Sequence, residues 1–339
     1  MAVKPMPRYV IHVGPHKTGS SYLQLLFQEL SPQLRERGIL YPAHWIDPRV
    51  PGHSMLVPRL RARDDAALSD ELSKLNASDC ETILISSEDI ASLLADDIAL
   101  LKSYLRGQPA TIVFYCRRWL DLLPSIWQES VKQGQSTTLP QFMAGNLMNP
   151  FTSHALNYAI QLDRFEQVFG MENVTVASYS NIVEQDGGDL GDHFFRCFLS
   201  WPNAPLPRGL RPNASLDILD TETIRVLNAF EWMFCGRRSA ELRVRYLNMK
   251  SALDLALPLA AMERHRAALR LNENAPGLRM LHEEIFKKYG PRLAPPKSGR
   301  YFFVQKQGSI HHIDQSYLLM DGVTVALRMA YQKVRGADQ

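Results

Sequence analysis

"RYVIHVGPHKTGSSYLQLLFQEL", from Arg8 to Leu30, contains a strand pattern, a glycine turn and a helix pattern in direct succession. The run Tyr9–Val13 is short and apolar, as expected for a buried strand, and apolar residues recur with helical spacing after Ser21. A strand that passes through a glycine turn into a helix leaves backbone N–H groups and the helix N-terminus free around one point. The sequence therefore predicts an anion-binding turn, which we call the glycine loop (residues 14–21).

Further continuous apolar runs predict strands that are buried on both faces, as in a parallel sheet. A short additional strand is expected after Gly38, which we predict to terminate the preceding helix. Helical segments separate the runs, which indicates an α/β fold: a three-layer, P-loop-like parallel sheet flanked by helices. The predicted longer strands are Tyr9–Val13, Thr82–Ser86, Thr111–Cys116 and Val174–Tyr179.

Length and composition allow a large core and favour no special class. The chain has 339 residues, 45% of them hydrophobic, and we predict a single domain. Its expected parts are a core at about 8–200, a helical C-terminal part at about 213–290 and a tail at 291–339. The net charge of +3 does not favour nucleic acid as a partner. The four cysteines have no metal-type spacing, and no apolar run predicts a transmembrane segment.

The glycine loop differs from the Walker A pattern G-x-x-x-x-G-K-[ST] in the place of its lysine. Gly14 and Gly19 have the correct spacing, but Ser20 follows Gly19 where a nucleoside triphosphatase has lysine. The loop's lysine is Lys17, and Ser21 keeps the hydroxyl position. The anion held here is therefore expected to differ from that of an ordinary Walker A loop.

"GPHKTGSSYLQ" resembles the 5′-phosphosulfate loop of sulfotransferases that use 3′-phosphoadenosine 5′-phosphosulfate, in particular their bacterial members. In that family the lysine precedes the second glycine. The resemblance implies that the loop binds the phosphosulfate of this cofactor and that the reaction requires no metal. The residues implied to bind it are Gly14, Pro15, His16, Lys17, Thr18, Gly19, Ser20 and Ser21.

A second anion-binding pattern follows the predicted strand "TIVFYC". The strand leads into Arg117 and Arg118, and the next helix is expected to begin with Asp121 as N-cap and Pro124 in its first turn. In sulfotransferases a strand-end arginine and a serine eight residues later bind the 3′-phosphate. Arg117 and Ser125 have this spacing, and a guanidinium with a hydroxyl suits a phosphate group.

Three further cofactor contacts are implied by the resemblance alone. Tyr22 stands where some members have a tryptophan that stacks on adenine. "PPKSGRYF" is similar to the C-terminal K-G-R loop of heparan sulfotransferases, which implies Lys297 and Arg300 as contacts.

The expected chemistry is in-line attack of an acceptor hydroxyl or amine on sulfur. Lys17 would stabilise the leaving group, and a general base would take the acceptor's proton. Glu88, directly beyond a predicted core strand, and His53, in a predicted loop, are the catalytic candidates; His44 and Asp89 are also possible.

The sequence thus predicts a cytoplasmic, bacterial-type sulfotransferase acting on a carbohydrate, lipid headgroup or small molecule. Two alternatives remain open. One is a P-loop kinase that uses Mg·ATP, and the other is a non-catalytic nucleotide-binding or interaction protein of the same fold. No nucleic-acid partner is expected, and the sequence predicts neither the acceptor nor the oligomeric state.

Overall fold

The computed structural model describes residues 6–336 except 49, 186–187, 208, 211–215, 271, 273–274 and 294–308. The chain divides into two compact units. Unit 1 consists of Met1–Arg118, Phe151–Asn213 and Arg279–Val304, and unit 2 of Trp119–Pro150, Ala214–Leu278 and Gln305–Gln339. The segments of the two units alternate along the chain, and the predicted single domain stays a prediction.

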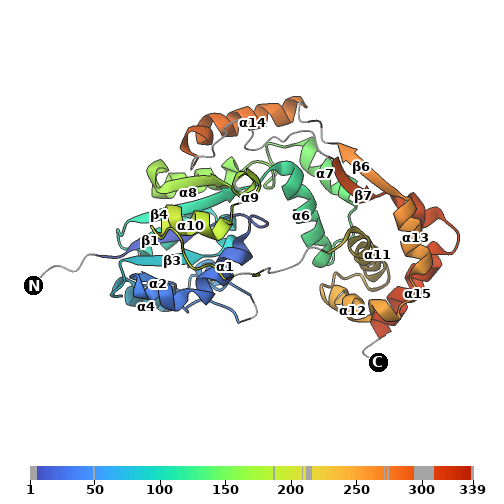
Figure 1. Ribbon diagram of the computed structural model, residues 1–339, viewed down its shortest axis with the longest axis horizontal. Coiled ribbons are helices and arrows are strands. Elements are labelled where there is room, and N and C mark those ends of the chain that lie inside the picture. The colour runs from blue at the N-terminus through green and yellow to red at the C-terminus, as the bar shows by residue number, and fades with distance from the viewer. Residues whose placement is uncertain are drawn as a thin grey trace, which may run out of the picture. The chain divides into compact units, whose positions relative to one another are not determined.

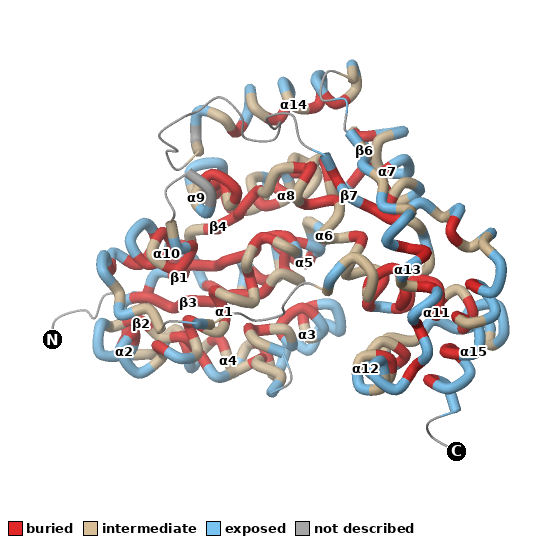
Figure 2. The backbone as a smooth tube through the Cα atoms, turned by 45° about the vertical axis from the view of Figure 1, so that its right-hand side comes forward, coloured by how far each residue is buried: buried red, intermediate tan, exposed pale blue. Residues whose placement is uncertain are grey.

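Unit 1 is built on a five-stranded parallel sheet with the order β2-β3-β1-β4-β5. Figure 1 labels its central strands β3, β1 and β4. The strands are almost wholly buried, which is why the sequence shows continuous apolar runs here and no alternation (Figure 2). The strand bounds are β1 (Arg8–His12), β2 (Ile39–Leu40), β3 (Thr82–Ser86), β4 (Ala110–Cys116) and β5 (Val174–Ser178).

Helices cover both faces of this sheet. On one face, Val10 of β1 and Leu84 of β3 share a core with Phe27 of α1 and Phe194 of α10. On the other face, Tyr9 of β1 donates a hydrogen bond to Asn76 of α4, and α8 contacts β4 and β5. The helical elements within unit 1 are α1 (Ser20–Glu29), α2 (Ser31–Glu36), α3 (Leu56–Ala62), α4 (Asp65–Asn76), η1 (Glu88–Ser92), α5 (Ala95–Tyr104), α8 (Ala159–Phe169), η2 (Met171–Asn173), α9 (Tyr179–Gln185), α10 (Leu190–Phe198) and η4 (Gly290–Arg292).

The strand order creates a switch point between β1 and β4. The chain leaves β1 toward β2 at one edge of the sheet, and it leaves β4 toward β5 at the other edge. Ligands of open α/β sheets bind at the carboxyl ends of strands at such a point. The glycine loop follows β1 and Arg117 follows β4, so both predicted anion-binding segments start there.

Unit 2 is mostly helical, with one two-stranded antiparallel sheet, β6–β7. The last described segment, residues 309–336, belongs to this unit: Tyr317 donates to Glu222, and Tyr331 donates to Glu231. The elements are α6 (Trp119–Lys132), α7 (Leu139–Met148), α11 (Ile218–Cys235), α12 (Glu241–Met249), η3 (Lys250–Ala252), α13 (Ala256–Arg264), β6 (Arg266–Arg270), β7 (Ser309–Ile313), η5 (Gln315–Leu319) and α15 (Val323–Gly336); α14 (Pro276–Tyr289) crosses from unit 2 into unit 1.

The predicted α/β class with a parallel sheet and flanking helices is confirmed. The expected helical C-terminal part also contains strand β6, which pairs with β7 of the tail. One local prediction was wrong. Helix α6 begins at Trp119, directly after the strand, so Asp121 is not its N-cap and Pro124 lies inside the helix. No described helix is both long and apolar enough to cross a membrane.

Candidate functional site

The glycine loop turns the chain from β1 into α1 with two left-handed residues. Lys17 has φ 70° and Gly19 has φ 83°, so successive peptide groups change direction around the loop. Thr18 is buried and its hydroxyl donates to the Pro15 carbonyl at 2.7 Å, which fixes the turn from inside. Helix α1 then starts at Ser20, and its N-cap residue Gly19 has no side chain that could cap the first backbone N–H groups. This is the backbone pattern of an anion-binding nest at a helix N-terminus.

A buried histidine lies beneath the loop. His12, the last residue of β1, is fully buried, and its Nδ1 is 2.8 Å from the Ser86 hydroxyl at the end of β3. A Cβ added to Gly14 would lie 2.9 Å from His12 Nε2 and 3.1 Å from Thr18 Oγ1. Gly14 is therefore required because the backbone passes directly over these side chains. Burial lowers the pKa of His12 to about 4, so the ring is neutral.

Three buried polar atoms of this region have no hydrogen-bond partner among the described residues: His12 Nε2, Ser20 Oγ and Arg117 Nε. A buried donor or acceptor left without a partner costs about 1–3 kcal/mol. Ser20 opens α1 at the loop, and Arg117 contacts the loop directly, as described next. These atoms fit a bound anionic group that would supply the missing partners.

Arg117 joins the two predicted anion-binding segments. One of its terminal guanidinium nitrogens donates to the Lys17 carbonyl at 2.8 Å, and its guanidinium carbon lies 5.2 Å from the ring centroid of Tyr179. Its backbone is held by Tyr158, whose hydroxyl donates to the Arg117 carbonyl at 2.6 Å. The arginine after β4 is thus fixed against the loop after β1, as the shared sheet edge predicts.

Ser125 and Arg118 have other local partners. Ser125 lies in α6 of unit 2, where its hydroxyl donates to the Asp121 carbonyl at 2.8 Å. The backbone N–H of Arg118 donates to the Ser180 hydroxyl at 3.1 Å. The pairing of Arg117 with Ser125 on one phosphate therefore stays a prediction.

Glu88 contacts His16 of the glycine loop. Its Oε1 lies 3.0 Å from Nδ1 of His16, and Asp89 Oδ1 lies 3.7 Å from Nε2 of the same ring. Burial raises the pKa of Glu88, but the hydrogen bond and charge of His16, with Lys17, outweigh it and lower that pKa below its ordinary value. Ser87, the N-cap residue of η1, makes no side-chain cap, so Glu88 and Asp89 do not belong to a capping box. Their contacts are with His16 of the loop.

His53 is held differently from what the sequence suggests. Its side chain is fully buried, its Nδ1 accepts the Ser86 N–H at 2.9 Å, and its Nε2 donates to the Pro42 carbonyl at 2.9 Å. Burial lowers its pKa to about 4. A buried ring with both nitrogens occupied has none left for an acceptor's proton. The geometry therefore favours Glu88 over His53 and indicates a structural role for His53, which ties the segment after β2 to the end of β3.

The remaining predicted contacts are placed as follows. The Tyr22 hydroxyl donates to the carboxylate of Asp189, the N-cap of α10, and its ring packs against the core of that face. His44 is partly buried, and its Nδ1 has no partner among the described residues. Lys297 and Arg300 lie outside the described residues.

Sequence reasoning missed His12, Tyr158 and Tyr179. His12 could have been found, because it is the last residue of a predicted strand at the edge where the loop begins. Tyr158 and Tyr179 could not, because their contacts with Arg117 join segments that are distant in sequence.

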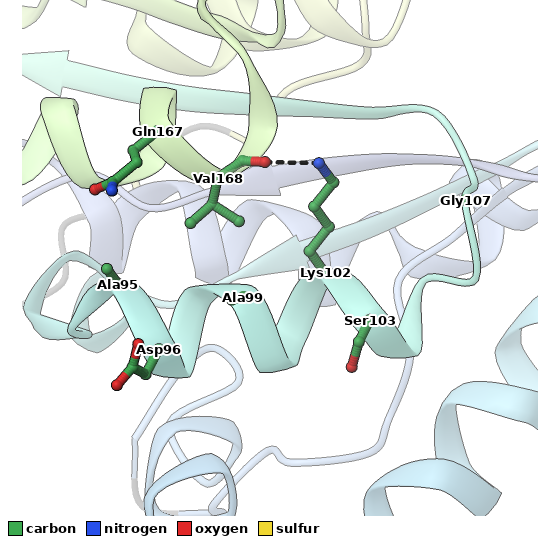
Figure 3. A pocket seen from close by; sticks show the side chains of 8 residues that line it. All are labelled: Ala95, Asp96, Ala99, Lys102, Ser103, Gly107, Gln167 and Val168. Carbon is green, nitrogen blue, oxygen red and sulfur yellow. Dashed lines mark hydrogen bonds between the residues drawn. The ribbon is translucent and has the colours of Figure 1, made fainter.

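A surface groove of about 580 Å³ lies apart from these residues (Figure 3). It runs between α5 and α8, and Lys102 crosses it to donate to the Val168 carbonyl at 2.6 Å. None of its lining residues comes from the glycine loop or from the ends of the strands. Among the described residues, no group of three or more His, Cys, Asp and Glu side chains could hold a metal ion.

Comparison with solved structures shows a distant structural similarity. The crystal structure of a sulfotransferase from Alicyclobacillus acidocaldarius matches with a TM-score of 0.37 and 16% identity, over 69% of this chain and 98% of that chain. No protein-family model matches the sequence, and a search of curated proteins finds no match. A similarity at this level carries no argument about function, which has to come from the site.

Proposed function

We propose that this protein is a sulfotransferase that moves a sulfuryl group from 3′-phosphoadenosine 5′-phosphosulfate to a hydroxyl or amine. The observation that carries the proposal is the hydrogen bond from Arg117 to the Lys17 carbonyl. It joins a phosphate-type loop whose lysine is displaced with the arginine expected to bind a second phosphate. Two anion-binding groups at one sheet edge suit a nucleotide with anionic groups at both its 5′ and 3′ positions.

The residues of the loop would divide the work on the phosphosulfate. The loop's N–H groups and the unpartnered Ser20 hydroxyl would bind its oxygens, and Lys17 would stabilise the charge that develops on the leaving group. Arg117 Nε, which also lacks a partner among the described residues, would serve the 3′-phosphate. The bound donor supplies the activated sulfuryl group, and Glu88 and its neighbours supply the basic site beside the loop.

The two alternatives make different demands on the same loop. A kinase would need a lysine after the second glycine and Mg²⁺ with the triphosphate, and this chain has Ser20 there. A non-catalytic binding protein would have no need for the hydrogen bond between His16 and Glu88 beside its loop. We therefore favour the sulfotransferase function over both alternatives. The acceptor class we propose is a hydroxyl-bearing carbohydrate, lipid headgroup or small molecule, in the cytoplasm.

Thermal unfolding with adenosine 3′,5′-bisphosphate, ADP and Mg·ATP in parallel tests the proposal. A ligand at 100 Kd adds about 2.7 kcal/mol. For a protein of this size we expect several degrees, at about 2–4 °C per kcal/mol. The proposal predicts this shift with the 3′,5′-bisphosphate in the absence of metal, and its loss in Arg117→Ala. A shift with Mg·ATP alone would identify a kinase, and binding without turnover of the donor would favour the non-catalytic alternative.

A further inference from the structure

The ring of His16 lies between two carboxylates. Nδ1 is 3.0 Å from Glu88 Oε1, a hydrogen bond, whereas Nε2 is 3.7 Å from Asp89 Oδ1, which is too long for one. The side chain of His16 is 59% exposed, against 28% for Glu88. One ring nitrogen is thus hydrogen-bonded to a partly buried carboxylate, whereas the other lies beyond hydrogen-bond distance of Asp89, on a side chain that is more than half exposed.

We propose that His16, oriented by Glu88, is the general base of this enzyme. The inference rests on the proposed function and deepens it. Glu88 would hold the Nδ1–H tautomer, which leaves the lone pair of Nε2 for the acceptor. This is the base-and-orienter arrangement of hydrolase triads, on an unrelated site.

The step balances without another reactant. The acceptor hydroxyl gives its proton to Nε2 as its oxygen bonds to sulfur. The bond between sulfur and the bridging oxygen breaks, and its electron pair leaves on the bisphosphate. The resulting imidazolium is paired with the Glu88 carboxylate and, being exposed, returns the proton to solvent.

His16 suits this role better than Glu88 acting directly. It belongs to the loop that would hold the phosphosulfate, so our proposal places its ring beside the reacting group. Oε1 of Glu88 is already occupied by His16. The hydrogen bond to Glu88 raises the pKa of His16 against the opposing effect of burial, whereas the pKa of Glu88 is lowered, and a stronger base near neutral pH accepts a proton more readily.

The charged and titratable groups around this pair come from four elements. Some of these groups act on His16 and others on its two carboxylate partners. The net result is that the pKa of His16 is raised. They are Glu88 and Asp89 of η1, Lys17 of the loop, His12 of β1 and Arg61 of α3.

A pH profile separates the two possible bases. His16 must be neutral to accept a proton, so the rate rises as pH increases through its pKa, which lies above 6.5. Glu88 as direct base would already be ionised below its ordinary value of 4.5, and the rate would be flat above that pH. The probe is transfer to water, measured as release of adenosine 3′,5′-bisphosphate from the donor, which needs no known acceptor.

The first experiment follows the His16 imidazole by NMR titration and does not depend on turnover. Glu88→Gln should lower the pKa of His16, and Asp89→Asn should lower it less, because only Glu88 is within hydrogen-bond distance. His16→Gln assigns the resonance, and His154→Gln, a change at an exposed histidine, is the matched control. An unchanged His16 titration in Glu88→Gln would overturn the proposal.

The second experiment measures donor turnover. His16→Gln should reduce it by about 10²–10⁴ at neutral pH, while the thermal shift with the 3′,5′-bisphosphate is largely kept. Glu88→Gln should move the rising limb of the profile to lower pH. A His16→Gln enzyme that turns over normally would sink the assignment of the base. If the wild-type protein showed no thermal shift with the 3′,5′-bisphosphate, the proposed sulfotransferase function would be wrong. The NMR result on the His16–Glu88 pair would still hold.

Discussion

Lys17 is the residue on which the proposed chemistry depends most. Lys17→Ala should lower donor turnover by about 10²–10³, the loss that follows removal of one preorganised charge-stabilising donor. Folding should be unaffected, because alanine keeps the Cβ at φ 70° and the side chain is only partly buried. Steady-state kinetics on the purified variant provides the measurement.

Lys102→Ala is the matched control for this substitution. Lys102 lies on α5 and donates to the Val168 carbonyl across a groove that contains no loop residue. The Lys102→Ala variant should turn over the donor at the wild-type rate. Equal activities in the two variants would show that the displaced lysine of the glycine loop has no special role.

At the level of single residues, the sequence predicted positions better than partners. The place of Arg117 at a strand end follows from the apolar run before it, and the structure places it against the loop. The state of His53 could not be predicted, because its hydrogen bond with the Ser86 N–H joins segments that are distant in sequence. The pairing of His16 with Glu88 was missed for the same reason.

Among the structural elements, the turn from β1 into α1 depends on Gly19. Its φ of 83° costs an L-residue about 1–2 kcal/mol. A Cβ here would also lie 2.5 Å from Leu190 Cδ2 and 3.0 Å from Tyr179 Cε2. Leu190 is 3% exposed and packed in the core, so it cannot easily move away. Overpacking of this kind adds about 1–3 kcal/mol.

Gly19→Ala should therefore lower the free energy of unfolding more than Gly107→Ala, as measured by urea denaturation. Gly107 has a similar φ of 78°, but no heavy atom lies within 4 Å of its added Cβ. The difference between the two variants isolates the contact from the backbone strain. Equal losses would mean that Leu190 and Tyr179 yield freely.

Strands were easier to predict than helix boundaries and strand pairing. Thr82–Ser86 was predicted to the residue, because a strand buried on both faces is marked by its own apolar run. The start of α6 was missed, since Pro124 and Asp121 resemble a first turn but the helix already begins at Trp119. Strand β6 was missed because its residues are half exposed and its partner β7 is far along the chain.

For the whole molecule, the alternation of the two units along the chain bears on cooperativity. Each unit is assembled from three segments of the chain, and segments of one unit connect those of the other. Unfolding of one unit would therefore release the ends of the segments that form the other. We therefore expect a single unfolding transition, as the predicted single domain requires. A buried ion pair in unit 2 provides the test.

Glu222 and Arg225 form that pair, with Arg225 Nε 2.8 Å from one Glu222 oxygen and a terminal nitrogen 2.7 Å from the other. Both side chains are almost fully buried, at 3% and 6% exposed. Arg225→Met would leave the carboxylate without its charge partner, although Tyr317 would still donate to it. Breaking a buried pair on one side costs about 3–5 kcal/mol.

Arg225→Met should thus lower the free energy of unfolding by about 3–5 kcal/mol. The measurement is urea denaturation followed by circular dichroism, with a single transition expected. Arg266→Met is the matched control, because Arg266 pairs with Glu263 at the same spacing but both side chains are close to half exposed. An exposed pair contributes about 0–1 kcal/mol, so this variant should remain near the wild type. The glycine loop and Arg117, which our proposal assigns to the 3′,5′-bisphosphate, belong to unit 1. With one cooperative transition, this ligand should therefore raise the midpoint of Arg225→Met as it does that of the wild type. Two transitions, only one of them sensitive to Arg225→Met, would show instead that the units unfold independently and that the chain is not a single domain.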